Sequence, residues 1–143
     1  MERKTPLKRG TKGLRRTRLR KKTRDPRKAL LRKADDLLQD YYRQNFPTTL
    51  CEGCGCQFNL MHHFVLKSHS NRLRFEPLNL IPLCKVCHSK VHGFHGELVN
   101  AEIILKRGKN WLKKLRELER EKINLGIKDL ENILRTFSQG QLN

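Results

Sequence analysis

The sequence predicts an α+β domain in which helices flank a small β-containing centre that is held together by a metal ion. Two Cys-x-x-Cys pairs, separated by 29 residues, predict the metal site, and β-prone pieces between them predict the strands. Apolar residues recur at helical spacing on both sides of this centre. A chain of 143 residues is long enough for one compact domain, and only 36% of it is hydrophobic. We therefore expect the metal ion to stabilise a thin core.

The amino-terminal part divides into a basic arm, residues 1–26, and a helix, residues 27–47. The arm has Thr, Gly and Pro breaks and no apolar periodicity, which is typical of a disordered segment. Asp25-Pro26 is a typical helix start, and Pro47 ends the helix. Leu30, Ala34, Leu37, Leu38 and Tyr41 mark one apolar helical face.

The predicted core covers residues 48–96, and further helices cover residues 97–143. Within the core, residues 48–51, 62–66 and 78–83 are β-prone, and residues 85–91 predict a short helix. After the core, residues 99–105 predict another helix. Apolar residues then mark a helical face within 111–118 and a last one within 127–137. The helices of residues 111–137 could pair two subunits or serve as core or lid, so the oligomeric state stays open.

The charge predicts an anionic partner, most simply a nucleic acid. The net charge is +18, and residues 1–28 hold 14 of the 32 Lys and Arg residues against Glu2 and Asp25. The candidate DNA-binding residues of the arm are Arg15, Arg16, Arg18, Arg20, Lys21 and Lys22. A solvated tail, an import peptide and a nuclear signal are alternatives for the same segment. Without an apolar run long enough for a membrane span or a signal peptide, we expect a cytoplasmic protein.

The cysteines predict a structural zinc site. Cys51, Cys54, Cys84 and Cys87 can close a tetrahedron that leaves no open position, as structural zinc requires. Cys56 could replace Cys54, or it could be a plain buried thiol. The run from Cys84 to His88 also fits c-type haem attachment, and a redox Cys-x-x-Cys is a further alternative. Neither accounts for two pairs as simply as zinc does.

Four of the six histidines have a spacing that indicates a second, more open metal site. His88 and His92 lie four apart on a predicted helix, so both imidazoles share one face. His62 and His63 are adjacent on a predicted strand and therefore point to opposite faces. One of them can bind the metal ion while the other acts as a base near neutral pH. His69 and His95 are expected to be ordinary surface or packed residues.

The order Cys-x-x-Cys, His-His, Asn, Cys-x-x-Cys-His-x-x-x-His resembles the zinc-stapled HNH endonucleases, whose core is a ββα-metal fold. The matched stretch runs over residues 51–93. The resemblance implies that His62 binds the catalytic metal ion, that His63 activates water and that Asn79 orients this base. It also implies that His88, and less securely His92, binds the metal ion. A narrower likeness, over residues 73–80 and the Cys pair that follows, links the chain to phage recombination nucleases of the NinG/Rap type.

The predicted function is therefore a metal-dependent endonuclease that hydrolyses DNA phosphodiester bonds, with structural Zn²⁺ and a catalytic Mg²⁺ or other divalent cation. Arg72 and Arg74, in the loop between His63 and Asn79, are candidates for gripping neighbouring phosphates. The alternative is a non-catalytic zinc module that binds nucleic acid. The sequence leaves open whether DNA or RNA is the substrate, and which cation is used.

Overall fold

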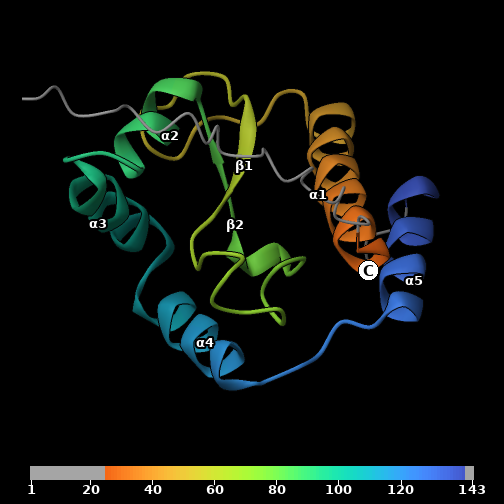
Figure 1. Cartoon of the computed structure of the whole chain (residues 1–143). Coiled ribbons are helices and arrows are strands. Elements are labelled where there is room, and N and C mark those ends of the chain that lie inside the picture. Colours follow the sequence, from red (N-terminus) through yellow and green to blue (C-terminus); the bar gives the residue numbers. More distant parts are fainter. Residues whose placement is uncertain (1–24, 141–143) are drawn as a thin grey trace, which may run out of the picture.

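A two-stranded antiparallel sheet forms the centre of the protein, and helices surround it (Figure 1). The computed structural model describes residues 25–140. The elements in chain order are α1 (Pro26–Asn45), β1 (Leu60–His63), a 3₁₀ turn η1 (Pro77–Asn79), β2 (Leu80–Leu83), α2 (Lys85–Val91), α3 (Gly96–Arg107), α4 (Lys109–Arg120) and α5 (Ile127–Ser138). The predicted combination of a small sheet with flanking helices is confirmed.

The strand register places His62 and His63 on opposite faces of the hairpin. His62 lies opposite Ile81, and His63 lies opposite Leu80. Residues directly opposite each other in an antiparallel pair share a face, and successive residues alternate between faces. Ile81 belongs to a buried cluster with α3 and the cysteines, whereas Leu80 belongs to a cluster with α1 and α5. Each histidine therefore has a different set of neighbours.

Helices pack on the hairpin from two opposite sides (Figure 1). On one side α1 and α5 lie together, and Leu38 and Phe137 from these helices pack with Met61 and Leu80 of the strands. On the other side, Val99 and Ile103 of α3 pack on the second cluster of buried residues. The hydrophobic interior is thus divided into two small clusters with the hairpin between them. Such a divided interior fits the expectation that a metal ion contributes to stability.

The helix start predicted at Asp25-Pro26 is confirmed. The Asp25 carboxylate accepts a hydrogen bond from the backbone N–H of Arg27 at 3.0 Å, and Pro26 occupies the first helical position. The side-chain oxygen satisfies a backbone N–H that has no partner inside the helix, and proline needs no such partner. This start fixes where α1 enters the fold.

The strands differ from the predicted ones for identifiable reasons. Residues 48–51 form no strand, and Leu50 only bridges Gln57, because the chain turns back in a cysteine-containing loop. β1 ends at His63 rather than at residue 66. Beyond it, the backbone of Val65 bonds to the side chain of Asn79 instead of to a strand partner. α3 begins three residues earlier than predicted.

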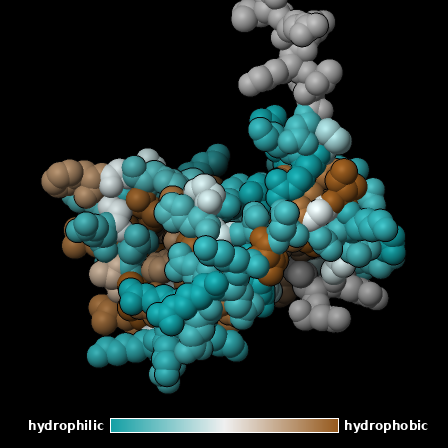
Figure 2. Space-filling model, turned by 60° about the horizontal axis from the view of Figure 1, so that its bottom comes forward, coloured by the Kyte–Doolittle hydropathy of each residue, from teal (hydrophilic) through white to brown (hydrophobic). Residues whose placement is uncertain are grey.

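The described helices include no stretch that combines the length and the apolarity needed to cross a bilayer. Figure 2 shows a face covered mainly by hydrophilic residues, with hydrophobic ones scattered between them. Such a surface agrees with the 32% of charged residues in the sequence and with a polar partner.

Candidate metal centres and catalytic site

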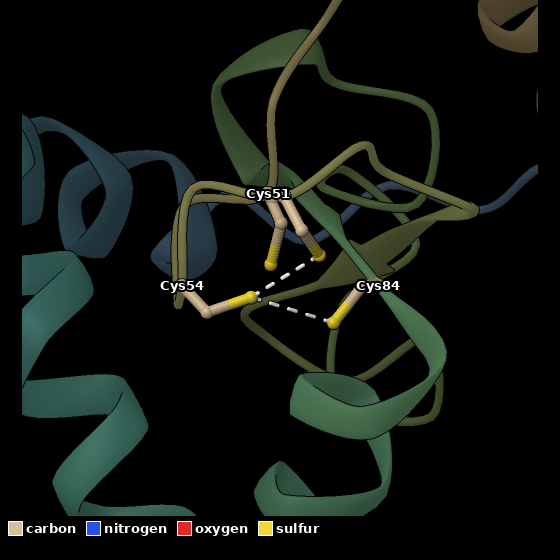
Figure 3. A group of neighbouring side chains, drawn as sticks. Cys51, Cys54 and Cys84 are labelled. Atoms are coloured by element: carbon tan, nitrogen blue, oxygen red, sulfur yellow. Dashed lines mark hydrogen bonds between the residues drawn. The ribbon is translucent and has the colours of Figure 1, made fainter.

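Two turns bring the cysteines together. The first turn carries Cys51 and Cys54, and Gly55 in it adopts a φ of 77°, a conformation that suits glycine. The second turn is the start of α2, where the Cys84 thiol accepts a hydrogen bond from the backbone N–H of Cys87 at 3.3 Å. Figure 3 shows Cys51, Cys54 and Cys84 directed toward a common centre. The same turn that closes the cysteine site therefore begins α2.

All five thiols gather at this centre. The sulfur atoms of Cys51, Cys54, Cys56 and Cys84 lie within 4.8 Å of one another. Cys54 Sγ is 3.2 Å from Cys56 Sγ and 3.6 Å from Cys84 Sγ. The edge of a tetrahedron with Zn–S bonds of about 2.3 Å is about 3.8 Å. These separations therefore fit one zinc ion.

Cys87 also lies next to this group of sulfur atoms. A Cβ atom placed on Gly53 would be 2.8 Å from Cys87 Sγ and 3.1 Å from Cys87 Cβ, so glycine leaves room for the Cys87 side chain. The predicted set contained Cys87, and the predicted alternative put Cys56 in place of Cys54. In the structure, the thiols of Cys51, Cys54 and Cys84 lie together. Cys56 and Cys87 both lie next to them and are the candidates for the fourth ligand.

Backbone hydrogen bonds prepare two of these thiols for a metal ion. The peptide N–H of Cys56 lowers the pKa of Cys54 to about 6, and the peptide N–H of Cys87 lowers the pKa of Cys84. By contrast, burial raises the pKa of Cys87. Thiolates are the forms that bind metal ions, so the first two positions are the most readily ionised.

We expect Cys87 to be the fourth ligand and Cys56 to be dispensable. Cys56→Ser should retain one zinc ion per chain and the absorption spectrum of a four-thiolate site after Co²⁺ substitution. Cys87→Ser should lose a thiolate band or bind zinc more weakly. If Cys56→Ser loses zinc while Cys87→Ser keeps it, the ligand set is the one with Cys56.

A second cluster consists of three imidazoles. His62 comes from β1, and His88 and His92 come from α2 and its C-cap. Each offers a ring nitrogen within 4.8 Å of the others, and Nε2 of His88 is 3.3 Å from Nε2 of His92. Helical spacing of four residues places the last two on one face, as predicted. Because Cys84 begins the helix that carries both residues, the cysteine site and the histidine cluster are joined through α2.

Two imidazoles of this cluster, those of His62 and His88, are shifted toward their neutral form. Burial, and then the nearby rings of His88 and His92, lower the pKa of His62 from 6.5 to about 4. Burial and the neighbouring His92 also lower the pKa of His88. A neutral imidazole keeps a free lone pair, so the three nitrogens fit a divalent cation. Imidazole suits Zn²⁺, Ni²⁺ and similar ions better than Mg²⁺.

The lowered pKa of His62 can be measured directly. In zinc-loaded protein without added divalent cation, the His62 ring should titrate near pH 4 in NMR spectra and stay neutral at pH 6. In His92→Ala the neighbouring positive charge is removed, so the midpoint should rise. A wild-type midpoint near 6.5 would contradict the burial of this ring.

His63 is buried and held by one strong contact. Its Nε2 lies 2.8 Å from the backbone carbonyl oxygen of Arg74. A carbonyl only accepts, so Nε2 carries the proton and Nδ1 keeps a free lone pair. Burial lowers the pKa of His63, while the bond to Arg74 acts in the opposite direction. The ring is therefore neutral at pH 7 with one defined nitrogen available as a base.

Asn79 is fully buried and closes the loop that follows His63. Its side-chain oxygen accepts from the Val65 N–H at 2.7 Å, and its amide donates to the carbonyls of Val65 and Leu73, both at 2.9 Å. Leu73 directly precedes Arg74. Asn79 therefore fixes the peptide next to the carbonyl that receives the His63 hydrogen bond.

A cleft of about 700 Å³ connects these groups. It is lined by His62, His63, His88 and His92 and by Asp36, Gln39, Asp40 and Arg43 of α1. The cleft gives a substrate access to both the imidazole cluster and the predicted base. The histidines predicted to be ordinary, His69 and His95, are both exposed.

Arg72 and Arg74 are engaged inside the protein. Arg72 pairs with Glu76 at 2.8 Å and with Glu121 at 3.0 Å. Arg74 forms a two-pronged pair with Asp35 and is 15% exposed. Their predicted phosphate contacts stay predictions, and such contacts would compete with these ion pairs. The six arm residues from Arg15 to Lys22 lie outside the described residues.

Residues 51–94 match the family model described as HNH endonuclease. This segment is an HNH domain. It contains every cysteine and every histidine of the chain except His95. Helices α1, α3, α4 and α5 lie outside the matched segment. Neither a search of curated proteins nor a search of solved structures gave a match.

Sequence reasoning missed the residues that hold the HNH domain from outside. Arg107 of α3 forms a two-pronged pair with Glu52, at 2.5 and 2.8 Å, and donates to the carbonyl of Leu80 at 3.0 Å. Trp111 donates its ring N–H to the carbonyl of Leu78 at 2.9 Å. These contacts join the cysteine turn to the residues around Asn79. Helical periodicity marks Trp111 only as an apolar residue, and nothing in the sequence marks the partners, which are mostly backbone atoms.

Proposed function

We propose that the protein is a metal-dependent endonuclease that hydrolyses phosphodiester bonds of DNA. An HNH domain by itself indicates a nuclease or another nucleic-acid-related activity. One observation supports the catalytic reading: three clustered imidazoles and a differently oriented fourth line the same cleft. A module that only binds nucleic acid would have no use for this arrangement.

His62, His88 and His92 would hold the catalytic cation. When bound, a divalent cation polarises the scissile phosphate and stabilises the charge on the leaving 3′ oxygen. Three protein nitrogens leave coordination positions free for water and phosphate, as a catalytic site requires. Mg²⁺ is the proposed cation in use, although the imidazoles also suit Mn²⁺, Ni²⁺ and Zn²⁺.

His63 would act as the general base. Its Nδ1 takes a proton from the attacking water, while its Nε2–H continues to donate to the Arg74 carbonyl. That hydrogen bond also stabilises the ring once it is charged, and the nearby Asp35 carboxylate acts in the same sense. The products would carry 5′-phosphate and 3′-hydroxyl ends. Asn79 would keep the base in place through the loop that it closes.

The basic arm would add affinity that does not depend on sequence. If residues of the arm contact about six phosphates, the logarithm of affinity should fall with the logarithm of salt concentration at a slope near −5. The cytoplasmic location and the role in phage recombination are part of the proposal. A reducing compartment would keep the five thiols available for zinc.

A plasmid-nicking assay tests the proposal. Zinc-loaded protein with Mg²⁺ or Mn²⁺ should convert supercoiled plasmid into nicked and linear forms, and chelation should stop the reaction. Parallel incubations with linear, forked and four-way DNA, and with matched RNA, define the substrate. If no DNA form is cut with either cation although the protein binds DNA, the non-catalytic zinc module is the correct reading. If RNA is cut and DNA is not, the substrate is RNA rather than DNA.

A further inference from the structure

Two polar side chains of α1 contact the segments around the proposed catalytic histidines. One bonds to the strand β1, which carries His62 and His63, and the other bonds to Arg74 in the loop that follows. Asp35 and Gln39 lie one helical turn apart and share one face of α1. Both are half-buried, and neither belongs to the segment that matches the HNH family model. Their partners, in contrast, lie inside that segment.

Gln39 holds the strand next to His62. Its amide donates to the Met61 carbonyl at 2.8 Å, and its side-chain oxygen accepts from the Met61 N–H at 2.8 Å. Met61 lies opposite Pro82 in a non-hydrogen-bonded pair, so its N–H and carbonyl point away from β2. A single glutamine thus takes the place that a third strand would have at this edge. It fixes the peptide that leads directly into His62.

Asp35 holds the residue that orients His63. Its two carboxylate oxygens accept from Arg74 Nε at 3.1 Å and Arg74 Nη2 at 2.6 Å. Both side chains are 15% exposed, so water screens this pair only weakly. The carbonyl oxygen of the same Arg74 lies 2.8 Å from Nε2 of His63. Moving Arg74 would therefore release the imidazole from its single defined tautomer.

We propose that Asp35 and Gln39 make α1 a positioning element of the catalytic site, a role that rests on the proposed endonuclease function. Asp35 fixes the tautomer and orientation of His63 through Arg74. Gln39 fixes the path of β1 and thereby the place of His62 in the imidazole cluster. Small displacements of reacting groups cost large factors in rate, about 100-fold for an error of 1 Å. Gln39 lines the cleft together with the histidines, and Asp35 acts on His63 through Arg74.

The test compares polar variants of α1 with matched controls. The first variant is Asp35→Asn, which weakens the two hydrogen bonds from Arg74 to this side chain. The second is Gln39→Met, which keeps the length of the side chain and removes both of its hydrogen bonds to Met61. Gln44→Leu is an exposed control on the same helix. Leu130→Ala in α5 is a control for lost stability, because it removes a fully buried side chain without touching β1 or Arg74.

Two readouts separate positioning from stability. Nitrogen-15 NMR of the zinc-loaded protein reports the tautomer of His63, which should be the Nε2–H form in the wild type and a mixture in Asp35→Asn. In nicking assays at temperatures where each variant is folded, kcat should fall at least tenfold in Asp35→Asn and Gln39→Met with little change in KM. Asp35→Glu, which keeps a carboxylate for Arg74, should recover part of the loss. Gln44→Leu should match the wild type in both readouts.

The outcomes are distinct. If Asp35→Asn leaves the His63 tautomer unchanged, or if both variants lose no more activity than an equally destabilised Leu130→Ala, the positioning role is wrong. If either variant fails to fold, Arg74→Lys provides the same test, with a smaller shift toward mixed tautomers expected and an unchanged tautomer contradicting the proposal. If the wild type cuts no nucleic acid, the proposed function fails. The NMR comparison then still decides whether α1 sets the state of His63.

Discussion

Replacement of His63 by Ala should reduce the nicking rate by a factor of about 100 to 10,000, because the positioned base contributes roughly that much to proton transfer. The side chain is buried and bonded only through Nε2, so its removal leaves both metal clusters in place. Zinc content and affinity for DNA should therefore stay at the wild-type level. The measurement is single-turnover nicking of supercoiled plasmid, together with metal analysis and a binding assay.

His95→Ala is the matched control for this experiment. His95 is exposed and precedes α3 without a side-chain capping hydrogen bond, so its removal should leave the nicking rate unchanged. A His63→Ala protein that nicks at the wild-type rate would exclude this residue as the base. Loss of zinc or of binding in the same variant would show that His63 stabilises the structure instead.

Loss of the zinc ion should unfold the HNH domain. Structural zinc contributes about 10–16 kcal/mol of binding free energy in small zinc modules, more than the usual stability of a domain. Cys84→Ser removes a thiol that is common to both candidate ligand sets and also begins α2. The variant should lose cooperative thermal unfolding and nicking together, because His88 and His92 depend on this helix.

Chelation of the wild-type protein provides the reversible counterpart. A strong zinc chelator should abolish the circular dichroism signal of the folded protein, and added Zn²⁺ should restore this signal. The control is Cys56→Ser, which should keep its melting temperature within a few degrees of the wild type. An apoprotein that unfolds at the same temperature as the zinc-loaded protein would mean that the two apolar clusters suffice without metal.

The candidate site could be predicted from sequence where spacing alone decides geometry. The alternation of a strand separates His62 from His63, and the pitch of a helix brings His88 to His92. Each Cys-x-x-Cys pair likewise brings its own two thiols together on a tight turn. These are local rules that hold whatever the rest of the chain does.

Contacts between distant segments could not be predicted in the same way. Arg74 is a basic residue in a polar loop, and only the fold reveals that Asp35 of α1 neutralises it. Gln39 bonds to a backbone, so no complementary residue type marks its partner. The end of β1 depends on Asn79, whose side chain replaces a strand neighbour for Val65. In each case a side chain bonds to a residue far away in the sequence, and the sequence offers other partners of the same kind.

The central claim is that the chain binds two ions in separate places, one sealed by thiolates and one held by imidazoles with open positions. Metal analysis of the wild type and of His62→Ala after dialysis against Mn²⁺ tests it most directly, with electron paramagnetic resonance to report bound Mn²⁺. We predict one zinc ion per chain in both proteins, and one exchangeable Mn²⁺ in the wild type that His62→Ala fails to bind. Equal Mn²⁺ binding by both proteins, or loss of zinc in His62→Ala, would contradict the account.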